Sequence, residues 1–193
     1  MKKLTRDDLY TLEAYARERA AFRARVLAHK RPRSVAIGAH VTLLFEDRLT
    51  IQYQVQEMLR VERIFEPAGI DEELEAYNPL VPDGSNLKAT MLIEYPDPDE
   101  RARRLVELHD IERRVALRIG TMPPIVAVAD EDMDRSTDSK TSAVHFLRFD
   151  LDPAHAAAFK NGTAAEFAID HPHYKERAAV TDETRVALAA DLD

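Results

Sequence analysis

The 193-residue chain contains no cysteine and only five glycines. Without cysteine there are no disulfides, thiolate zinc sites, iron–sulfur ligands or cysteine nucleophiles. The few glycines form none of the glycine-rich loops with which nucleotide-binding folds hold phosphates. No apolar run reaches the length of a membrane span, and no apolar segment follows the basic residues of the first ten positions, as a signal peptide would require. We therefore expect a cytoplasmic protein that does not enter a membrane.

Motifs that specify a reaction are missing as well. The sequence has no Gly-x-Ser-x-Gly elbow, no His-Glu-x-x-His and no paired Glu-x-x-His helices. Asp130, Asp132 and Asp134 have the spacing that opens a calcium-binding loop. However, the sixth and twelfth positions are Arg135 and Thr141 instead of glycine and glutamate. Whether the protein is an enzyme is therefore left open by its motifs.

The net charge of −8 is unevenly distributed. Residues 1–33 hold ten basic and four acidic side chains, a net charge of +6, which leaves −14 for the rest of the chain. A nucleic-acid-binding protein usually carries its positive charge on the folded body, so this distribution disfavours nucleic acid as a partner. Cations near the end of a helix also stabilise the helix dipole, which gives the basic segment a structural explanation.

The order of the expected elements predicts one domain over residues 1–193, with an N-terminal helical arm at 1–33 and an α+β body at 34–193. Leu87–Tyr95 alternates between apolar and polar residues, which indicates a half-buried strand. The apolar runs 115–119 and 125–129 predict a hairpin, and 142–151 a further strand. Strands that come in groups, with hairpins between some and helices between others, favour a mixed or mainly antiparallel sheet packed with several helices.

A long central helix is predicted at about residues 48–65. On a helical wheel, Thr50, Gln54, Glu57 and Val61 form a stripe that we expect to face the core. Gln52, Gln56 and Arg63 lie opposite and are expected to face solvent. The preceding pair, Glu46 and Asp47, is interpreted as capping the helix, because carboxylates stabilise helix N-termini.

Polar side chains in a core need partners, since burying an unpaired polar group costs about 1–3 kcal/mol. Three kinds of partner are expected for Glu57: an internal one, such as Arg48, Arg60 or a backbone edge; a metal ion; or a small polar ligand. A metal would be held by side chains chosen from Glu57, His145, His40 and Glu94, and carboxylate with imidazole suits iron, manganese or zinc. A ligand would be held by Gln54, Glu57 and Arg60. His145 is expected to point inward, since it shares a strand face with Leu147 and Phe149.

The segments HVTLLFEDRLTIQYQVQEMLRVERIF, YNPLVPDGSN with KATMLIEY, and KTSAVHFLRF resemble a bacterial family of uncharacterised proteins, domain of unknown function 3501. The similarity extends from LTRDDLY to the last expected helix. The resemblance implies a standalone single-domain protein and carries over no activity and no catalytic residues. It also implies association with rubrerythrin-like or iron–sulfur oxidoreductase-like proteins, and hence a role linked to redox or peroxide metabolism.

The leading hypothesis is thus a cytoplasmic accessory protein that binds a metal or small ligand near Glu57, Gln54 and His145. One alternative is an enzyme with a carboxylate and histidine active site on the long helix, where Glu57 would act as a base or metal ligand. Another alternative is an interaction protein that docks a redox partner through residues 1–33. A homodimer is compatible with each hypothesis.

Overall fold

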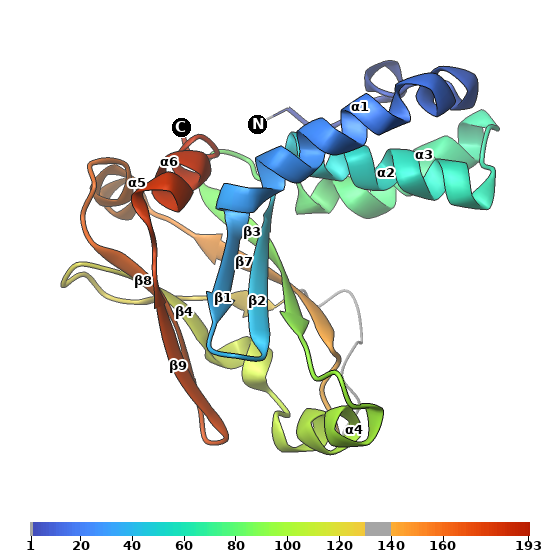
Figure 1. The fold of residues 1–193 in the computed structure, drawn as a ribbon. Coiled ribbons are helices and arrows are strands. Elements are labelled where there is room, and N and C mark those ends of the chain that lie inside the picture. Colours follow the sequence, from blue (N-terminus) through green and yellow to red (C-terminus); the bar gives the residue numbers. More distant parts are fainter. Residues whose placement is uncertain (1, 130–139) are drawn as a thin grey trace.

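The computed structural model describes residues 2–129 and 140–193, so the acidic run at Asp130, Asp132 and Asp134 lies outside the described residues. The described chain forms α-helices and two antiparallel sheets, which confirms the α+β class (Figure 1). The helices are α1 (Leu12–Lys30), α2 (Arg48–Glu62), α3 (Pro67–Tyr77), α4 (Pro98–Glu107), α5 (Pro153–Lys160) and α6 (Asp182–Ala189). The strands are β1 (Ser34–Ile37), β2 (Val41–Glu46), β3 (Asn86–Ile93), β4 (Val115–Ile119), β5 (Ile125–Val126), β6 (Val128–Ala129), β7 (Val144–Asp150), β8 (Ala165–His171) and β9 (Tyr174–Ala179). Short 3-10 helices are η1 (Arg6–Asp8), η2 (Arg31–Arg33), η3 (Asn78–Leu80) and η4 (Ile111–Arg114).

The two sheets have the strand orders β1-β2-β3-β7-β6 and β5-β4-β8-β9. The segment 125–129 joins them, because β5 pairs with β4 and β6 pairs with β7. On the opposite side, β1 lies against β8 and β9. The predicted hairpin of 115–119 with 125–129 is therefore confirmed for Ile125 and Val126 only. After Ala127 the chain passes to the other sheet.

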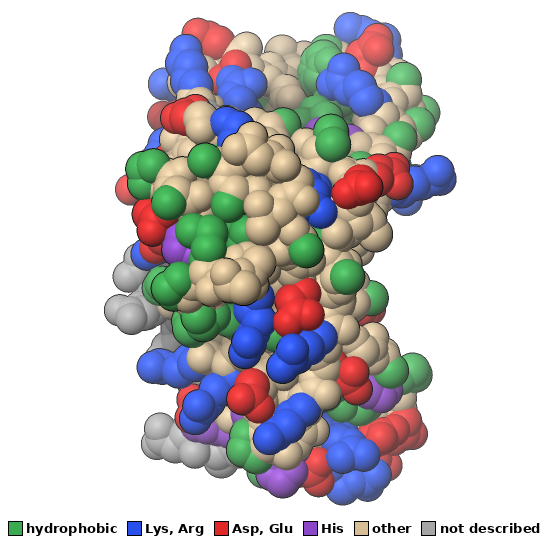
Figure 2. Space-filling model, turned by 90° about the vertical axis from the view of Figure 1, so that its left-hand side faces the viewer, with side chains coloured by type: hydrophobic (Ala, Val, Ile, Leu, Met, Phe, Trp, Pro, Cys, Tyr) green, Lys and Arg blue, Asp and Glu red, His purple; other side chains and the backbone are tan. Residues whose placement is uncertain are grey.

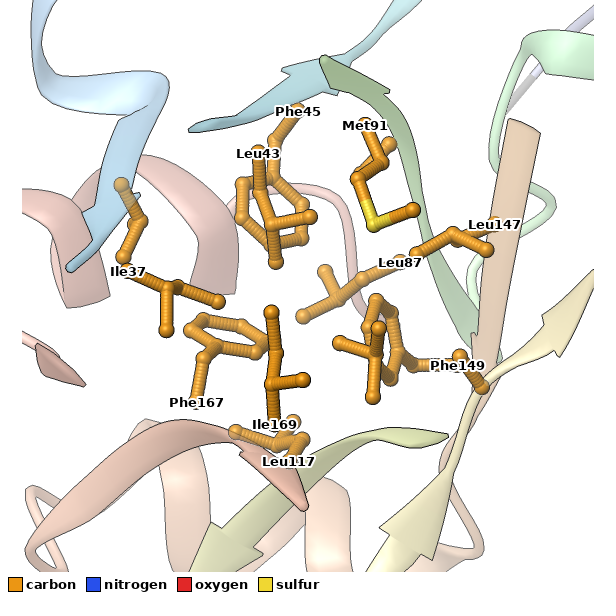
Figure 3. Packing of buried hydrophobic residues seen from close by; sticks show 14 of the residues in the cluster. Ile37, Leu43, Phe45, Leu87, Met91, Leu117, Leu147, Phe149, Phe167 and Ile169 are labelled. Atoms are coloured by element: carbon orange, nitrogen blue, oxygen red, sulfur yellow. The ribbon is translucent and has the colours of Figure 1, made fainter. Parts of the chain in front are cut away.

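Apolar side chains of both sheets meet in one core (Figure 3). In β3, every second residue points into this core, as the alternation at Leu87–Tyr95 predicts; Leu87 and Met91 are completely buried. Rings from both sheets are in contact there: Phe45 lies 5.0 Å and Phe149 5.4 Å from Phe167, measured between ring centroids. Burial of such large rings is the main source of hydrophobic stabilisation.

Helices α1, α2 and α3 form a separate layer above the sheets (Figure 1). The middle helix, α2, is buried on two sides. Ile51, Val55 and Leu59 pack in a cluster with residues of α3, and Tyr53 packs toward residues of α1. The helix predicted within residues 1–33 thus contacts a helix of the expected body. Within the described residues, no helix has the length and apolar character that a bilayer crossing requires.

The N-terminal cap of α2 is confirmed at Asp47, whose Oδ1 accepts hydrogen bonds from the backbone N–H groups of Leu49 (3.0 Å) and Thr50 (2.9 Å). Glu46 is not part of the cap; its carboxylate accepts a hydrogen bond from Thr90 Oγ1 at 2.9 Å. The predicted end at residue 65 is wrong, because α2 stops at Glu62. The next residue, Arg63, takes a left-handed conformation with φ 56° and ends the helix.

The predicted orientation of α2 is confirmed for Thr50, which is 0% exposed, but is wrong for other residues. Gln56, expected in solvent, is 0% exposed: its Oε1 accepts a hydrogen bond from the Tyr10 N–H at 2.6 Å, and its Nε2 donates to the Tyr10 carbonyl at 3.4 Å. Val61, expected in the core, is 64% exposed. Gln54 is only half-buried. A helix with two buried sides gives a wheel without a single apolar face, which explains the error.

A buried arginine joins the helical layer to the sheets. Arg33 is 2% exposed, and its Nε donates to the Phe45 carbonyl at 3.3 Å. Its Nη1 donates to the Ala187 carbonyl at 2.7 Å and lies 3.6 Å from Asp47 Oδ2. Its Nη2 pairs with Asp191. One guanidinium therefore contacts β2, the cap of α2, α6 and the segment that follows α6.

The two carboxylates around Arg33 differ in acidity. Burial raises the pKa of Asp191 to about 6, although Arg33 acts in the opposite direction. Burial also raises the pKa of Asp47, but Arg33, the Thr50 backbone N–H and His29 together outweigh burial and hold this pKa below its ordinary value. Asp47 is thus the firmly ionised partner of the arginine.

Outside the core, charges of both signs are interspersed on the face seen in Figure 2, on the β8–β9 side of the molecule. Two ion pairs on these strands illustrate this mixing: Lys175 lies 3.5 Å from Asp170, and Arg177 lies 3.2 Å from Glu166. Such exposed pairs contribute little to stability but keep a surface free of single-sign patches.

The buried amide of α2 leads to a first prediction. Gln56→Ala should lower the free energy of unfolding by about 1–3 kcal/mol, because it removes a buried amide that makes hydrogen bonds to both backbone groups of Tyr10. The matched control is Gln54→Ala, two residues away on the same helix, which should change stability by about 0.5 kcal/mol or less. Urea denaturation of both variants checks this. Equal effects would contradict the observed orientation of α2.

A second prediction concerns Arg33. Arg33→Met should destabilise the fold by about 3–5 kcal/mol, since it leaves Asp191 buried without its counter-charge and leaves Asp47 with His29 alone. Arg31→Met removes the same charge from the same short helix at an exposed position and should have an effect near zero. Thermal or chemical unfolding of both proteins measures the difference. A stable Arg33→Met protein would show that the cluster does not hold the layers together.

Candidate functional site

The candidate residues from the sequence lie in three separate places. Glu57, Gln54 and Arg60 belong to α2, and His145 lies in β7. His40 is in the turn between β1 and β2, and Glu94 directly follows β3. The structure brings His40 and Glu94 together, whereas Glu57 and His145 share no contact partner among the described residues.

Glu57 faces α1 and is neutralised there. Arg19 forms a two-pronged ion pair with it, with Nε 2.8 Å from Oε1 and Nη2 2.7 Å from Oε2. The Tyr15 hydroxyl donates to Oε1 at 2.6 Å, and Arg60 Nε lies 3.7 Å from the same atom. The hydrogen bonds from Arg19, followed by that from Tyr15, lower the pKa of Glu57 to about 2 in spite of burial. A carboxylate with such a pKa is a weak base at neutral pH and serves here to hold α1 on α2.

His145 points inward as predicted and is 5% exposed. Its Nε2 lies 2.9 Å from the Ser142 carbonyl oxygen and 2.8 Å from Thr141 Oγ1, and Thr141 donates onward to Glu112 at 3.1 Å. Because a carbonyl oxygen only accepts, Nε2 carries the proton and offers no lone pair to a metal ion.

A metal site is not evident in the described part of the chain. Over residues 2–129 and 140–193, no three histidine, aspartate or glutamate side chains are grouped so that they could hold a metal ion. The binding of iron, manganese or zinc by Glu57, His145, His40 and Glu94 stays a prediction from the sequence. Of these four residues, only His40 and Glu94 are neighbours.

The turn that carries His40 is held from both sheets. The His40 N–H donates to the Tyr174 hydroxyl at 3.1 Å, and that hydroxyl donates to the Ile37 carbonyl at 2.6 Å. Gly38 has φ +69°, and a Cβ atom there would lie only 2.6 Å from the Tyr174 oxygen, so the turn needs glycine. Tyr174 of β9 thereby fixes a turn that belongs to the other sheet.

His40 and Glu94 are locked together through their backbones. The Glu94 N–H donates to the His40 carbonyl at 2.7 Å, and His40 Nδ1 donates to the Glu94 carbonyl at 3.0 Å. The Glu94 carboxylate accepts a hydrogen bond from Thr42 Oγ1 at 2.9 Å. With Nδ1 protonated, the neutral imidazole presents the lone pair of Nε2.

Two further side chains complete the arrangement, and both were missed from the sequence. The His40 ring stacks on Tyr95, with 4.0 Å between ring centroids and 16° between planes. Arg101, on α4, donates from Nη1 to the Tyr95 carbonyl at 3.1 Å. Burial raises the pKa of the Tyr95 phenol, so this side chain acts as a neutral stacking platform. In the sequence, Tyr95 is marked only by its position close to the end of β3, and Arg101 only by its place on the next helix.

These residues line a concavity of about 730 Å³ on the outer face of the five-stranded sheet. We call it the His40 groove; it is bounded by Ala39, His40, Leu92, Ile93, Glu94, Tyr95, Pro96, Arg101, Ala143 and Val144. Its volume lies within the range of small-molecule sites. The groove combines an acceptor carboxylate, an imidazole lone pair and a guanidinium with the apolar side chains of Leu92 and Val144.

Fold and groove define a small α+β protein whose sheet has an open, partly polar outer face. The chain belongs to the family described as protein of unknown function, DUF3501, which matches residues 3–192. This confirms the family indicated by the resemblance.

A solved relative shares the whole fold. The crystal structure of a novel protein of unknown function from Burkholderia pseudomallei K96243, at 1.90 Å resolution, is 53% identical in sequence to this chain. The similarity covers 100% of each chain, with a TM-score of 0.94. No curated protein matches the chain.

The ion pair of Glu57 leads to a pH-dependent prediction. Because its pKa is lowered from 4.5 to about 2 on folding, Glu57 stabilises the fold above about pH 4.5, and this contribution is lost as the pH falls toward 2. Glu57→Gln should therefore melt several degrees below the wild type at pH 7, and the gap should close in acid. Glu75→Gln, an exposed change of equal charge on α3, is the control and should leave the pH profile unaltered. A gap that stays constant down to pH 2 would contradict the prediction.

Proposed function

We propose that the protein binds a small polar ligand in the His40 groove. The observation that supports this most strongly is the meeting of His40 and Glu94, which are 54 residues apart in the sequence. Each side chain is held by one hydrogen bond to a neighbouring element, so the polar groups are placed before a ligand arrives. Such preorganisation reduces the entropy lost on binding.

The chemistry of the groove indicates the class of ligand. Glu94 and the Nε2 lone pair of His40 accept hydrogen bonds and so suit an N–H or O–H donor. The Arg101 guanidinium suits a carboxylate or phosphate. The ligand is therefore a small molecule with an acidic group and a donor group, such as an amino acid or a hydroxy acid. Its hydrocarbon part would lie on Leu92 and Val144.

The accessory role in redox or peroxide metabolism, and docking of a rubrerythrin-like or iron–sulfur oxidoreductase-like partner, rest on the family resemblance. The exposed arginines of α1, Arg17, Arg23 and Arg25, offer a basic surface that would suit an acidic partner. A small ligand in the His40 groove is compatible with such a role. The α1 surface and the groove belong to different parts of the fold.

The test is a titration of the purified protein with a panel of amino acids and hydroxy acids, followed by melting temperature and amide NMR shifts. A ligand should raise the melting temperature and shift resonances of residues 92–101 in a saturable manner. His40→Gln and Arg101→Gln should each weaken its binding about tenfold or more, since each removes a hydrogen bond to a polar ligand.

The control is Arg103→Gln, an exposed change on α4 outside the groove, which should bind as the wild type does. Melting curves without ligand show whether each variant is folded. The proposal fails if no compound in the panel gives a saturable response. It also fails if the folded groove variants bind with unchanged affinity.

A further inference from the structure

A second concavity, of about 600 Å³, opens on the same outer face at the other end of β3 and β7. We call it the Lys88 groove; it is lined by Lys3, Pro79, Leu80, Val81, Asp83, Lys88, Val128, Ala129, Phe146, Leu147 and Arg148. The residues of β3 that point outward are those between its core residues, so Lys88 and Leu92 lie on one face. The first belongs to the Lys88 groove and the second to the His40 groove.

Positive charge is concentrated in the Lys88 groove. Lys88 and Arg148 are direct partners in the register of β3 and β7, and Lys3 lines the same wall. Among the described residues of the lining, Asp83 is acidic, and Asp150 lies beside Arg148. Three cations thus meet two described carboxylates, Asp83 and Asp150, in a protein whose net charge is −8. This local excess runs against the average composition of the chain.

The cations retain hydrogen-bonding capacity. Lys88 Nζ donates to the Pro79 carbonyl, which uses one of its three N–H groups. Arg148 Nε donates to the Asp150 carboxylate at 2.9 and 3.1 Å. In the described part of the chain, the two remaining Arg148 nitrogens have no hydrogen-bond partner and Lys3 has no ion pair.

The surroundings of Lys88 lower the pKa of its ammonium group. Burial lowers the pKa of this half-buried ammonium, and the charges of Arg148 and Lys3 lower it further, while Asp83 and Asp150 act in the opposite direction. A neighbouring anion would remove part of this electrostatic cost and raise the pKa again.

The wall of the groove is built before any ligand binds. Asp83 Oδ1 accepts hydrogen bonds from the Ser85 N–H at 2.9 Å and the Ser85 hydroxyl at 2.8 Å. The Asp83 N–H donates to Asn86 Oδ1 at 3.3 Å, and the Asp193 N–H donates to the Gly84 carbonyl at 2.9 Å. The turn next to Lys88 is thus tied to itself and to the segment after α6. Beside it, Leu80, Val128 and Phe146 supply apolar surface.

We propose that the Lys88 groove binds a small organic anion, with a carboxylate or phosphate against Lys88 and Arg148 and a hydrocarbon part against Leu80, Val128 and Phe146. This site is separate from the His40 groove: it offers donors for an anion and an apolar wall but no imidazole. A charged head on an aliphatic body matches both features.

The experiment is an NMR titration of the full-length protein with hexanoate, hexyl phosphate, inorganic phosphate and neutral hexanol. Saturable shifts are expected at residues 79–88 and 146–148 with at least one of the two hexyl anions. The comparison between these two anions distinguishes a carboxylate site from a phosphate site. Inorganic phosphate should bind more weakly and hexanol not at all. Binding should weaken as the salt concentration rises.

Variants separate a binding role from a structural one. Lys88→Gln and Arg148→Gln should each weaken binding about tenfold or more, whereas Lys88→Arg, which keeps the charge, should retain most of it. Lys175→Gln on β9 removes one positive charge far from the groove and is the matched control. The Lys88 ammonium, followed by the NMR shift of its side chain, should show a higher pKa in the complex.

The proposal is overturned if neither hexyl anion gives saturable shifts at millimolar concentration. It is also overturned if Lys88→Gln and Lys175→Gln reduce binding equally, or if hexanol binds as well as the anions. None of these results bears on the His40 groove, whose ligand panel and variants are different.

Discussion

The structure depends on one buried guanidinium. Arg33 joins β2, the cap of α2 and α6, which are far apart in the sequence, and its counter-ions Asp47 and Asp191 are themselves nearly inaccessible. A buried guanidinium is stable only when its counter-ions lie within reach. The cluster therefore determines how the helical layer is positioned on the sheets. It also reaches the Lys88 groove. Two residues after Asp191, the backbone of Asp193 holds Gly84 in the turn that forms the groove wall.

Local patterns predicted individual helices and strands, but only where one face of the element packs on a core. In β3, a core on one face gives strict alternation, and the burial of Leu87, Met91 and their neighbours follows it. β9 has no such signal, because Lys175, Glu176 and Arg177 are exposed at the edge of the second sheet, and nothing in this polar run predicts a strand. The switch of 125–129 between two sheets is likewise a tertiary event, invisible in a run of five apolar residues.

For the candidate site, the sequence predicted which types of side chain need a partner, but it did not predict which residues lie close to one another. The carboxylate of Glu57 does need a partner, and an ion pair was one of the three expected solutions, but the arginine that supplies it, Arg19, comes from α1. Sequence spacing cannot reveal a contact across 38 residues. The prediction that Gln56 faces solvent failed for a related reason. Its partner is the backbone of Tyr10, and a pattern of side-chain types carries no information about backbone partners. His40 and Glu94 meet because β2 and β3 pair in one particular register, in which Val41 lies opposite Ile93.

The same register sets the relation between the two grooves. Lys88 and Glu94 are six residues apart along β3 and its extension, about 20 Å at the rise of an extended strand. This exceeds the Debye length of about 8 Å at physiological ionic strength, so an anion at Lys88 changes the potential at Glu94 very little. Any coupling between the grooves would therefore have to pass through the strand itself. β3 is paired on both sides and packed on the core along its whole length, which makes it a stiff spacer. The two proposed sites, which differ in charge and lie on one sheet face, would then be occupied independently, each by the ligand that its own side chains select.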